Sequence, residues 1–319
     1  MDPDLHFGNG KKLRYGENPH QKGWFYETEE GKDDPLAIQK FQFLQGKELS
    51  YNNYLDIDGA LYAISHLGGD EAACVIVKHT NPCGAALRAT VAEAYQAAWY
   101  EGDPLAAFGG IMAVNREVNA ELAEKMIKNF FEVLLAPSIT GEAKAAFAKK
   151  PNIRVLVNPA LQHPSPSVAS QMHKVRGGML VTTPDNAVVT RQGLKTVTKR
   201  VPTDAEVDDL LFAWALCRSS KSNTVVVAKN KNLIASGVGQ QDRKRCAELC
   251  ASKAGERMKG AVAASDAFFP FRDATDVLIK AGVTAIIQPG GSVNDQQSVD
   301  ACNESDVAMV YTGIRAFRH

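Results

Sequence analysis

A lysine and a histidine stand side by side at the end of an apolar run, in the stretch EAACVIVKHTNPCGAALRAT at residues 71–90. A histidine can accept a proton near neutral pH, and an adjacent lysine can stabilise negative charge that develops during a reaction. Neighbouring strand residues point to opposite faces, so Lys78 and His79 can reach one substrate only where the strand ends. The residues 81–84, Asn-Pro-Cys-Gly, predict a turn that provides this ending, in the crevice at the carboxyl ends of the strands. The dipeptide alone fits a surface lysine beside a hydrogen-bonded histidine about equally well.

Other segments combine glycine, aromatic or basic residues with polar side chains. ASGVGQQDRKRC and IIQPGGSVND place glycines before polar residues, as anion-binding helix N-termini do, although a plain tight turn is the commoner meaning. SDAFFPFRD brackets aromatic residues with aspartates, which suits the wall of a pocket for a flat heterocycle as well as a core. LRYGENPHQ and GIRAFRH set arginine beside aromatic residues, a pairing that suits a phosphate and a stacked base but also a solvated loop or tail.

The pattern around His79 excludes a catalytic zinc of the deaminase type. That site needs His-x-Glu followed by Pro-Cys-x-x-Cys. Here Asn81 stands at the glutamate position, and Pro82-Cys83 lacks the second cysteine. We therefore predict no catalytic metal.

The elements that must position these residues follow an α/β alternation in both halves of the chain. Predicted strands cover residues 73–77, 111–114, 132–136, 153–157, 224–229, 233–236, about 262, 284–287 and 307–312. Predicted helices start at the capping boxes Thr90/Glu93 and Thr203/Glu206, ending near 100 and 217, and cover residues 120–130, 142–149 and a stretch from about 241. A Pro- and Ser-rich segment with a hairpin at residues 158–200 marks a boundary. The pattern favours a helix-covered sheet, and a duplication is possible, although no fixed sequence period proves it.

Composition limits the kinds of partner. Lys plus Arg and Asp plus Glu are 36 each among 319 residues, so no net charge draws the chain to nucleic acid or an anionic membrane. Six scattered cysteines without a C-x-x-C pair indicate reduced thiols in the cytoplasm. No run reaches 18 apolar residues, so we expect a soluble protein without membrane contact.

Nine stretches together resemble the transformylase domain of the bifunctional purine-biosynthesis family, which also carries IMP cyclohydrolase. In order they are LRYGENPHQ, LSYNNYLDIDGA, VKHTNPCGAA, DPLAAFGG, EVLLAPS, KSNTVVVAKN, GVGQQDR, SDAFFPFRD and GIRAFRH. The resemblance implies formyl transfer from 10-formyltetrahydrofolate to the 5-amino group of AICAR ribonucleotide. It also implies two zinc-free, cytidine-deaminase-like α/β/α subdomains, at residues 1–195 and 196–319, and an obligate homodimer with active sites at the interface.

The resemblance also assigns roles to residues. His79 would accept the proton, Lys78 would stabilise the transition state, and Asn223 would bond the formyl oxygen. The substrate-binding positions would be Arg14, Tyr15, Asn53, Phe108, Gly109, Glu132, Phe268, Arg315 and His319. The folate-side positions would be Gln241, Arg243, Lys244, Asp273, Ser292 and Val293. Glu132 stands where some members have aspartate. A monovalent cation near the dimer interface follows only by analogy.

The family's cyclohydrolase motifs do not precede Arg14, so we expect no IMP cyclohydrolase activity and accumulation of the formylated product unless a separate cyclohydrolase consumes it. Two alternatives stay open. Lys78 could form a Schiff base with a carbonyl substrate or pyridoxal phosphate, which reductive trapping would reveal. The chain could also be a purine-nucleotide-binding regulator that kept the fold without catalysis.

Overall fold

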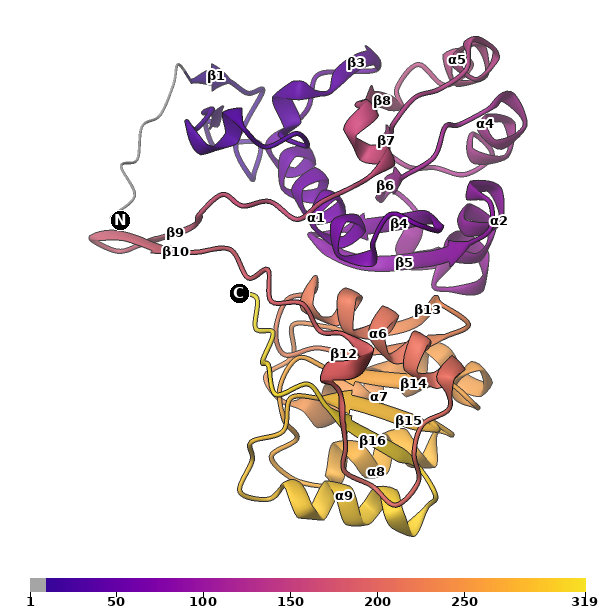
Figure 1. Ribbon diagram of the computed structural model, residues 1–319. Coiled ribbons are helices and arrows are strands. Elements are labelled where there is room, and N and C mark those ends of the chain that lie inside the picture. Colours follow the sequence, from indigo (N-terminus) through magenta and orange to yellow (C-terminus); the bar gives the residue numbers. More distant parts are fainter. Residues whose placement is uncertain (1–9) are drawn as a thin grey trace.

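The computed structural model describes residues 10–319, and in this part of the chain one mixed sheet of 12 strands joins the two halves. Its order is β11-β16-β15-β14-β12-β13-β5-β4-β6-β7-β8-β3. The halves lie one above the other in Figure 1. They meet where β13 pairs with β5 through Asn232 and Ala86. The predicted α/β class is confirmed.

The first half supplies one end of this sheet and the helices that cover it. In chain order it contains β3 (Gln42–Gln45), α1 (Tyr51–Leu67), β4 (Ala72–Lys78), β5 (Asn81–Arg88), α2 (Val91–Gln96), α3 (Pro104–Ala107), β6 (Ile111–Val114), α4 (Ala120–Met126), β7 (Val133–Ala136), α5 (Gly141–Ala148) and β8 (Arg154–Val157). Before it, β1 (Lys11–Lys12) pairs with β2 (Trp24–Phe25).

The second half repeats this succession, with the single helix α7 where the first half has α2 and α3. It contains β11 (Lys195–Thr196), α6 (Asp204–Arg218), β12 (Val225–Lys229), β13 (Asn232–Gly237), α7 (Arg243–Ala254), β14 (Val262–Ser265), α8 (Asp273–Lys280), β15 (Ala285–Gln288), α9 (Asp295–Glu304) and β16 (Ala308–Tyr311). Between the halves, β9 (Gln171–Val175) and β10 (Gly178–Thr182) form the predicted hairpin, which stands away from both in Figure 1.

The two halves have the same topology, and corresponding backbone hydrogen bonds recur within each half. The Gly109 amide donates to Phe130 at 2.8 Å, and the Gly260 amide donates to Gly282 at 2.9 Å. Both glycines have positive φ, 77° and 73°. Each precedes the first of three parallel strands, β6-β7-β8 and β14-β15-β16. The duplication considered from the sequence is therefore present in the fold, whereas the subdomain boundary at residues 195 and 196 stays a prediction.

The core lies on both faces of the sheet. On one face α1 and α6 share a continuous apolar cluster, represented by Ile57 and Leu210, which runs across both halves. On the other face each half has its own cluster, one around Phe131 and one around Phe269. The halves therefore share one apolar core on one face of the sheet and have separate cores on the other face.

Most predicted elements are confirmed, and their ends follow local chemistry. The side chains of Thr90 and Thr203 accept the backbone amides of Glu93 and Glu206, which is the capping-box geometry expected for α2 and α6. The third such box, at Ser50, begins α1, which is absent from the helices predicted from the sequence. The helix expected over 120–130 ends at Met126. The helices α8 and α9 were also not predicted.

Candidate functional site

The Lys78–His79 dipeptide lies at a two-residue hairpin turn between β4 and β5. Lys78 pairs with Asn81, and the loop residues His79 and Thr80 have φ of 52° and 64°. Two positive φ values are what tight turns of type I′ require. The turn predicted at residues 81–84 is therefore wrong, because the chain has already reversed and those residues begin β5.

The location at the carboxyl ends of the parallel strands is also wrong. The strand β4 runs antiparallel to β6, with Val77 opposite Ile111. The end of β4 consequently lies beside the beginning of β6, at the edge where β6, β7 and β8 start. This same edge carries Phe108, Glu132 and Arg154, so the dipeptide still meets other predicted site residues there.

The contacts of the dipeptide involve the Lys78 ammonium and the His79 backbone carbonyl, and they leave the imidazole exposed. The Lys78 ammonium donates a hydrogen bond of 2.8 Å to the carbonyl of Phe108. The Asn81 amide group donates to the carbonyl of His79 at 2.7 Å. His79 is exposed, whereas Lys78 is half-buried. The histidine side chain is therefore available to a substrate.

Beside this turn lies a network centred on Glu132. The buried Asn53 donates a hydrogen bond of 2.9 Å from Nδ2 to Glu132 Oε2. Arg154 Nη1 lies 3.5 Å from the same oxygen, and burial is the main cause that lowers the pKa of this guanidinium while Glu132 opposes the shift. Asn53 also belongs to the capping box of α1, so the start of this helix orients the carboxylate.

A cavity of about 560 Å³ opens next to Glu132. Its wall includes Arg14, Tyr15, Phe130 and Arg154. The Arg14 guanidinium lies 4.8 Å from the centre of the Tyr15 ring. Cationic groups and aromatic faces around a cavity of this size can hold a phosphorylated heterocycle. The structure thus gathers three of the predicted substrate positions, whereas Lys78 and His79 are not among the residues that line this cavity.

A second group of predicted residues lies in the other half, around the fully buried Asp266. Arg243 Nη2 donates to Asp266 Oδ1 at 3.0 Å, and the Ser222 hydroxyl donates to Oδ2. The amide of Ala316 donates to the Asp266 carbonyl at 2.9 Å. One aspartate therefore connects the segment before Asn223, the start of α7 and the C-terminal residues.

Asn223 and the C-terminal residues lie on segments that contact this aspartate through Ser222 and Ala316. The Asn223 side chain donates to the Gln240 carbonyl at 2.9 Å, and the peptide bond that precedes Asn223 is cis. The guanidinium of Arg315 lies 4.4 Å from the ring centre of Phe317, and the His319 ring lies 5.7 Å from the same ring. Arg315 and His319 are exposed, which leaves both available for binding.

The remaining predicted positions are spread over the surface of the second half. Phe268 is half-buried, and Gln241 and Lys244 are exposed at the start of α7. The Asp273 carboxylate accepts the amide of Ala274 at 2.8 Å. Ser292 Oγ accepts the amide of Asn294, and the adjacent Val293 is fully exposed at 100%.

The two groups touch through Asn81. Its Oδ1 accepts the backbone amide of Lys221 at 2.8 Å. Among residues 10–319, no hydrogen bond or ion pair joins the side chain of Lys78 or His79 to Asn223. The sequence led to no predicted role in the site for Asn81, Arg154 or the buried Asp266. Asp266 did have a signal in the sequence, because an acidic residue between apolar runs needs a buried partner.

Other features of the described chain bear on cofactors and compartment. Between residues 10 and 319, no three His, Cys, Asp or Glu side chains are placed to hold a metal ion. None of the helices in this stretch has the length and apolar character needed to cross a membrane. All six cysteines are unpaired; Cys83 is half-buried and the others are buried, and burial raises the pKa of the Cys246 thiol to about 11.

Comparison with known proteins shows the family of the chain. Residues 3–253 match the family described as AICARFT/IMPCHase bienzyme. The bifunctional purine biosynthesis protein PurH of Aquifex aeolicus is 46% identical over 312 residues, which cover 97% of this chain and 59% of that protein. The PurH proteins of Anaeromyxobacter sp. and Acetivibrio thermocellus are each 45% identical, over 96% and 99% of this chain and 59% and 60% of theirs. The chain thus spans about three fifths of the length of these relatives. It belongs to the AICARFT/IMPCHase bienzyme family.

Proposed function

We propose that this chain transfers the formyl group of 10-formyltetrahydrofolate to the 5-amino group of AICAR ribonucleotide, with FAICAR and tetrahydrofolate as products. The observation that carries the proposal is the shared sheet edge. Lys78 and His79 lie at the same edge as Glu132, which borders a cavity walled by Arg14 and Tyr15. A ribonucleotide held there by its phosphate and its heterocycle would lie close to the exposed imidazole.

The chemistry of the reaction explains why a histidine and a lysine are needed. The AICAR amine is a weak nucleophile because its lone pair is delocalised into the ring and the carboxamide. As its nitrogen bonds to the formyl carbon, the His79 imidazole takes the proton that the amine loses. The formyl oxygen becomes an oxyanion, which the Lys78 ammonium and the Asn223 amide stabilise. The oxyanion then re-forms the carbonyl as the bond between the formyl carbon and N10 of the folate breaks, and N10 takes the proton held by the His79 imidazolium.

The expected size of each contribution follows from general experience. A positioned general base contributes about 10²–10⁴-fold to a rate, and one oxyanion donor about 10²–10³-fold. Holding two large substrates together contributes much of the remainder. The side chains of Gln241, Arg243, Lys244, Asp273, Ser292 and Val293 would bind the folate.

We further propose that two copies of the chain complete each site. The β9–β10 hairpin supports association, because Leu180 is 61% exposed and Met179 is 40% exposed on an arm that stands apart from the rest of the chain. Apolar side chains in such a position favour burial against a partner.

Two finer assignments complete the proposal. We assign each half to a cytidine-deaminase-like subdomain, which the repeated order of a hairpin followed by three parallel strands supports. The buried, unpaired thiols support a reducing cytoplasmic setting. The proposal concerns formyl transfer alone.

The test is a spectrophotometric assay of tetrahydrofolate formation from AICAR ribonucleotide and 10-formyltetrahydrofolate. Turnover that depends on both substrates would support the proposal. Tight binding of AICAR ribonucleotide without any transfer would instead favour a regulator. A borohydride-trapped adduct on Lys78 would favour Schiff-base chemistry.

A further inference from the structure

Each half of the chain contains a hairpin turn that a carboxylate holds in the same way. Asp56 Oδ1 accepts the backbone amide of Thr80 at 2.6 Å. In the second half, the two oxygens of Asp209 accept the amides of Asn230 and Lys231 at 2.8 and 2.6 Å. Asp56 and Asp209 occupy corresponding positions in α1 and α6, at the same spacing from the N-cap residues of these helices.

The turns themselves match residue by residue. Asn230 and Lys231 have φ of 54° and 48°, as His79 and Thr80 have positive φ in the first turn. Lys229 precedes the second turn as Lys78 precedes the first, and its ammonium donates to the carbonyl of Lys259 at 2.8 Å. The position that is histidine in the first turn is asparagine in the second.

The first turn needs support from its surroundings. Positive φ is unfavourable for residues with a side chain, and particularly for the β-branched Thr80. The helix α1 packs closely against it, because a Cβ on Gly59 would lie 3.1 Å from the Thr80 carbonyl oxygen. The hydrogen bond that the Thr80 amide donates to Asp56 is accordingly part of a tight contact between helix and turn.

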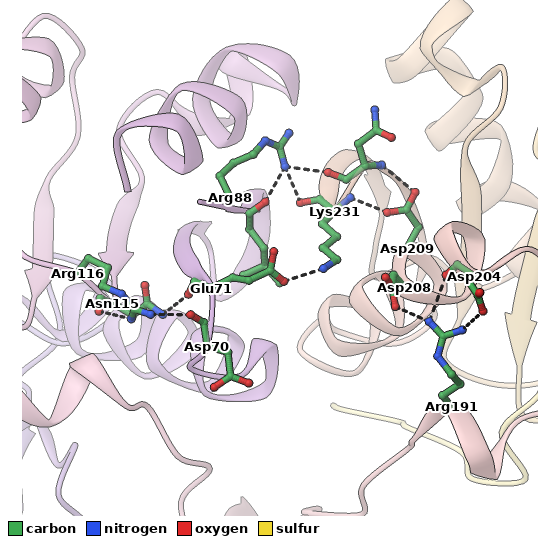
Figure 2. Close-up of polar contacts among 12 residues, drawn as sticks. Asp70, Glu71, Arg88, Asn115, Arg116, Arg191, Asp204, Asp208, Asp209 and Lys231 are labelled. Atoms are coloured by element: carbon green, nitrogen blue, oxygen red, sulfur yellow. Dashed lines mark hydrogen bonds and ion pairs between the residues drawn. The ribbon is translucent and has the colours of Figure 1, made fainter. Parts of the chain in front are cut away.

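The second turn serves the junction between the halves. Arg88 Nη1 donates to the carbonyl of Asn230 at 2.8 Å, and the amide of Leu87 donates to the carbonyl of Lys231 at 3.0 Å. The Lys231 ammonium pairs with Glu71 at 2.7 Å. Figure 2 shows Arg88 and Glu71 reaching this turn from the first half while Asp209 contacts it from the second. The turn at Asn230 and Lys231 therefore joins the two halves, whereas the corresponding turn in the first half carries His79.

The charges around Asp56 come from the site itself. Burial is the largest influence and raises the pKa of this carboxyl, and the charge of Glu132 acts in the same direction. The amides of Thr80 and His79 and the charge of the imidazole oppose the shift. Asp56 is therefore coupled both to the backbone and to the side chain of His79.

We infer that Asp56 is a positioning residue for formyl transfer: its carboxylate fixes the turn that aims the His79 imidazole and stabilises the imidazolium formed when that ring takes the substrate proton. This inference rests on the proposed function, since it gives His79 the role of proton acceptor. Asp209 holds the matching turn without a histidine and has no part in the reaction.

The matched substitutions Asp56→Asn and Asp209→Asn test this assignment. We expect Asp56→Asn to lower kcat about tenfold or more, with KM for AICAR ribonucleotide changed by less than about twofold. Asp209→Asn should keep kcat and lower the melting temperature, because an amide cannot accept both backbone donors. If the two variants lost kcat only in proportion to their loss of folded protein, the inference would be overturned.

A measurement without substrates separates this inference from the proposed function. Hydrogen exchange of the Thr80 amide should be faster in Asp56→Ala, which removes the accepting oxygen, than in the wild type, with the amides of Asn230 and Lys231 unchanged. Absence of formyl transfer by the wild type would refute the proposed function and the imidazolium role. Unchanged exchange at Thr80 would refute only the claim that Asp56 fixes the turn. Should Asp56→Asn fail to fold, Asp56→Ser removes the charge with a smaller side chain and is subject to the same readings.

Discussion

Asn81 Oδ1 accepts a hydrogen bond of 2.8 Å from the backbone amide of Lys221, so the hairpin that carries His79 is attached directly to the segment that carries Asn223. The same side chain donates to the carbonyl of His79 at 2.7 Å. The side-chain amide of Asn81 therefore links the two parts of the proposed site.

Removing this link should reduce both activity and stability. Asn81→Ala loses one bond to each side, and we expect it to lower the free energy of unfolding by about 1–2 kcal/mol and kcat by about tenfold. Urea unfolding and initial rates measure the two effects. Asn232 is the matched control, because it follows the second turn as Asn81 follows the first. Its buried side-chain amide has no hydrogen-bond partner among the described residues. A kcat of Asn81→Ala equal to that of Asn232→Ala would show that the link is irrelevant to function.

The two turn lysines should differ in activity but not in stability. Lys78 and Lys229 each donate a 2.8 Å bond to a backbone carbonyl, so Lys78→Met and Lys229→Met should each cost about 1 kcal/mol of stability. Only Lys78→Met should lower kcat, by about 10²–10³-fold, because only this ammonium lies beside the proposed oxyanion. Equal turnover in the two variants would mean that the Lys78 ammonium has a structural role alone.

The β9–β10 hairpin should control self-association. Leu180→Asp places a charge where an apolar side chain is expected to be buried, and we expect the dimer dissociation constant to rise about tenfold or more. Analytical ultracentrifugation measures this, and formyl transfer should fall with the dimer population. Leu105 is 87% exposed on α3, so Leu105→Asp is the control and should leave association unchanged. An unaltered dimer in Leu180→Asp would place the interface elsewhere.

Stability should fall on mild acidification because of His66. Burial is the main cause that lowers the pKa of this imidazole to about 4, below the ordinary 6.5, although Nδ1 lies 2.8 Å from the Tyr62 carbonyl. The unfolded chain therefore binds more protons than the folded chain between about pH 6.5 and 4, and stability rises with pH across this window by up to about 1 kcal/mol per unit. Urea midpoints from pH 4 to 7 measure the slope, which His66→Gln should reduce. An identical slope in that variant would assign the effect to other groups.

Local signals in the sequence predicted local structure well. The capping boxes at Thr90 and Thr203 predicted the starts of α2 and α6 because the reciprocal bonds need only residues three apart. The turn was misplaced because Asn-Pro-Cys-Gly at residues 81–84 has typical turn composition, whereas the real turn uses His79 and Thr80, which tolerate positive φ only with support from α1. Pro82 fits inside β5 because β13 pairs with that strand only at Ala86.

Relationships between distant segments could not be read from the sequence. The duplication preserves hydrogen-bond geometry, turn conformation and a few residue types at matched positions, such as Asp56 and Asp209, although the two helices differ elsewhere. The direction of β4 relative to β6 decides which sheet edge carries Lys78, and a sequence of alternating elements does not reveal that direction. The buried role of Asp266 depends on Arg243 and on C-terminal residues that come together only in the fold.

The most direct test of the account is the single-turnover rate of formyl transfer by His79→Asn. Asparagine is the residue at the corresponding position of the second turn, where it has φ of 54°, so the backbone should be retained. We predict a rate at least about 10²-fold below the wild type, with unchanged melting temperature and unchanged affinity for AICAR ribonucleotide. Asn230→His, made in parallel, should leave the rate unaltered. A His79→Asn rate equal to the wild-type rate would contradict the account, since the imidazole would then have no part in moving the proton.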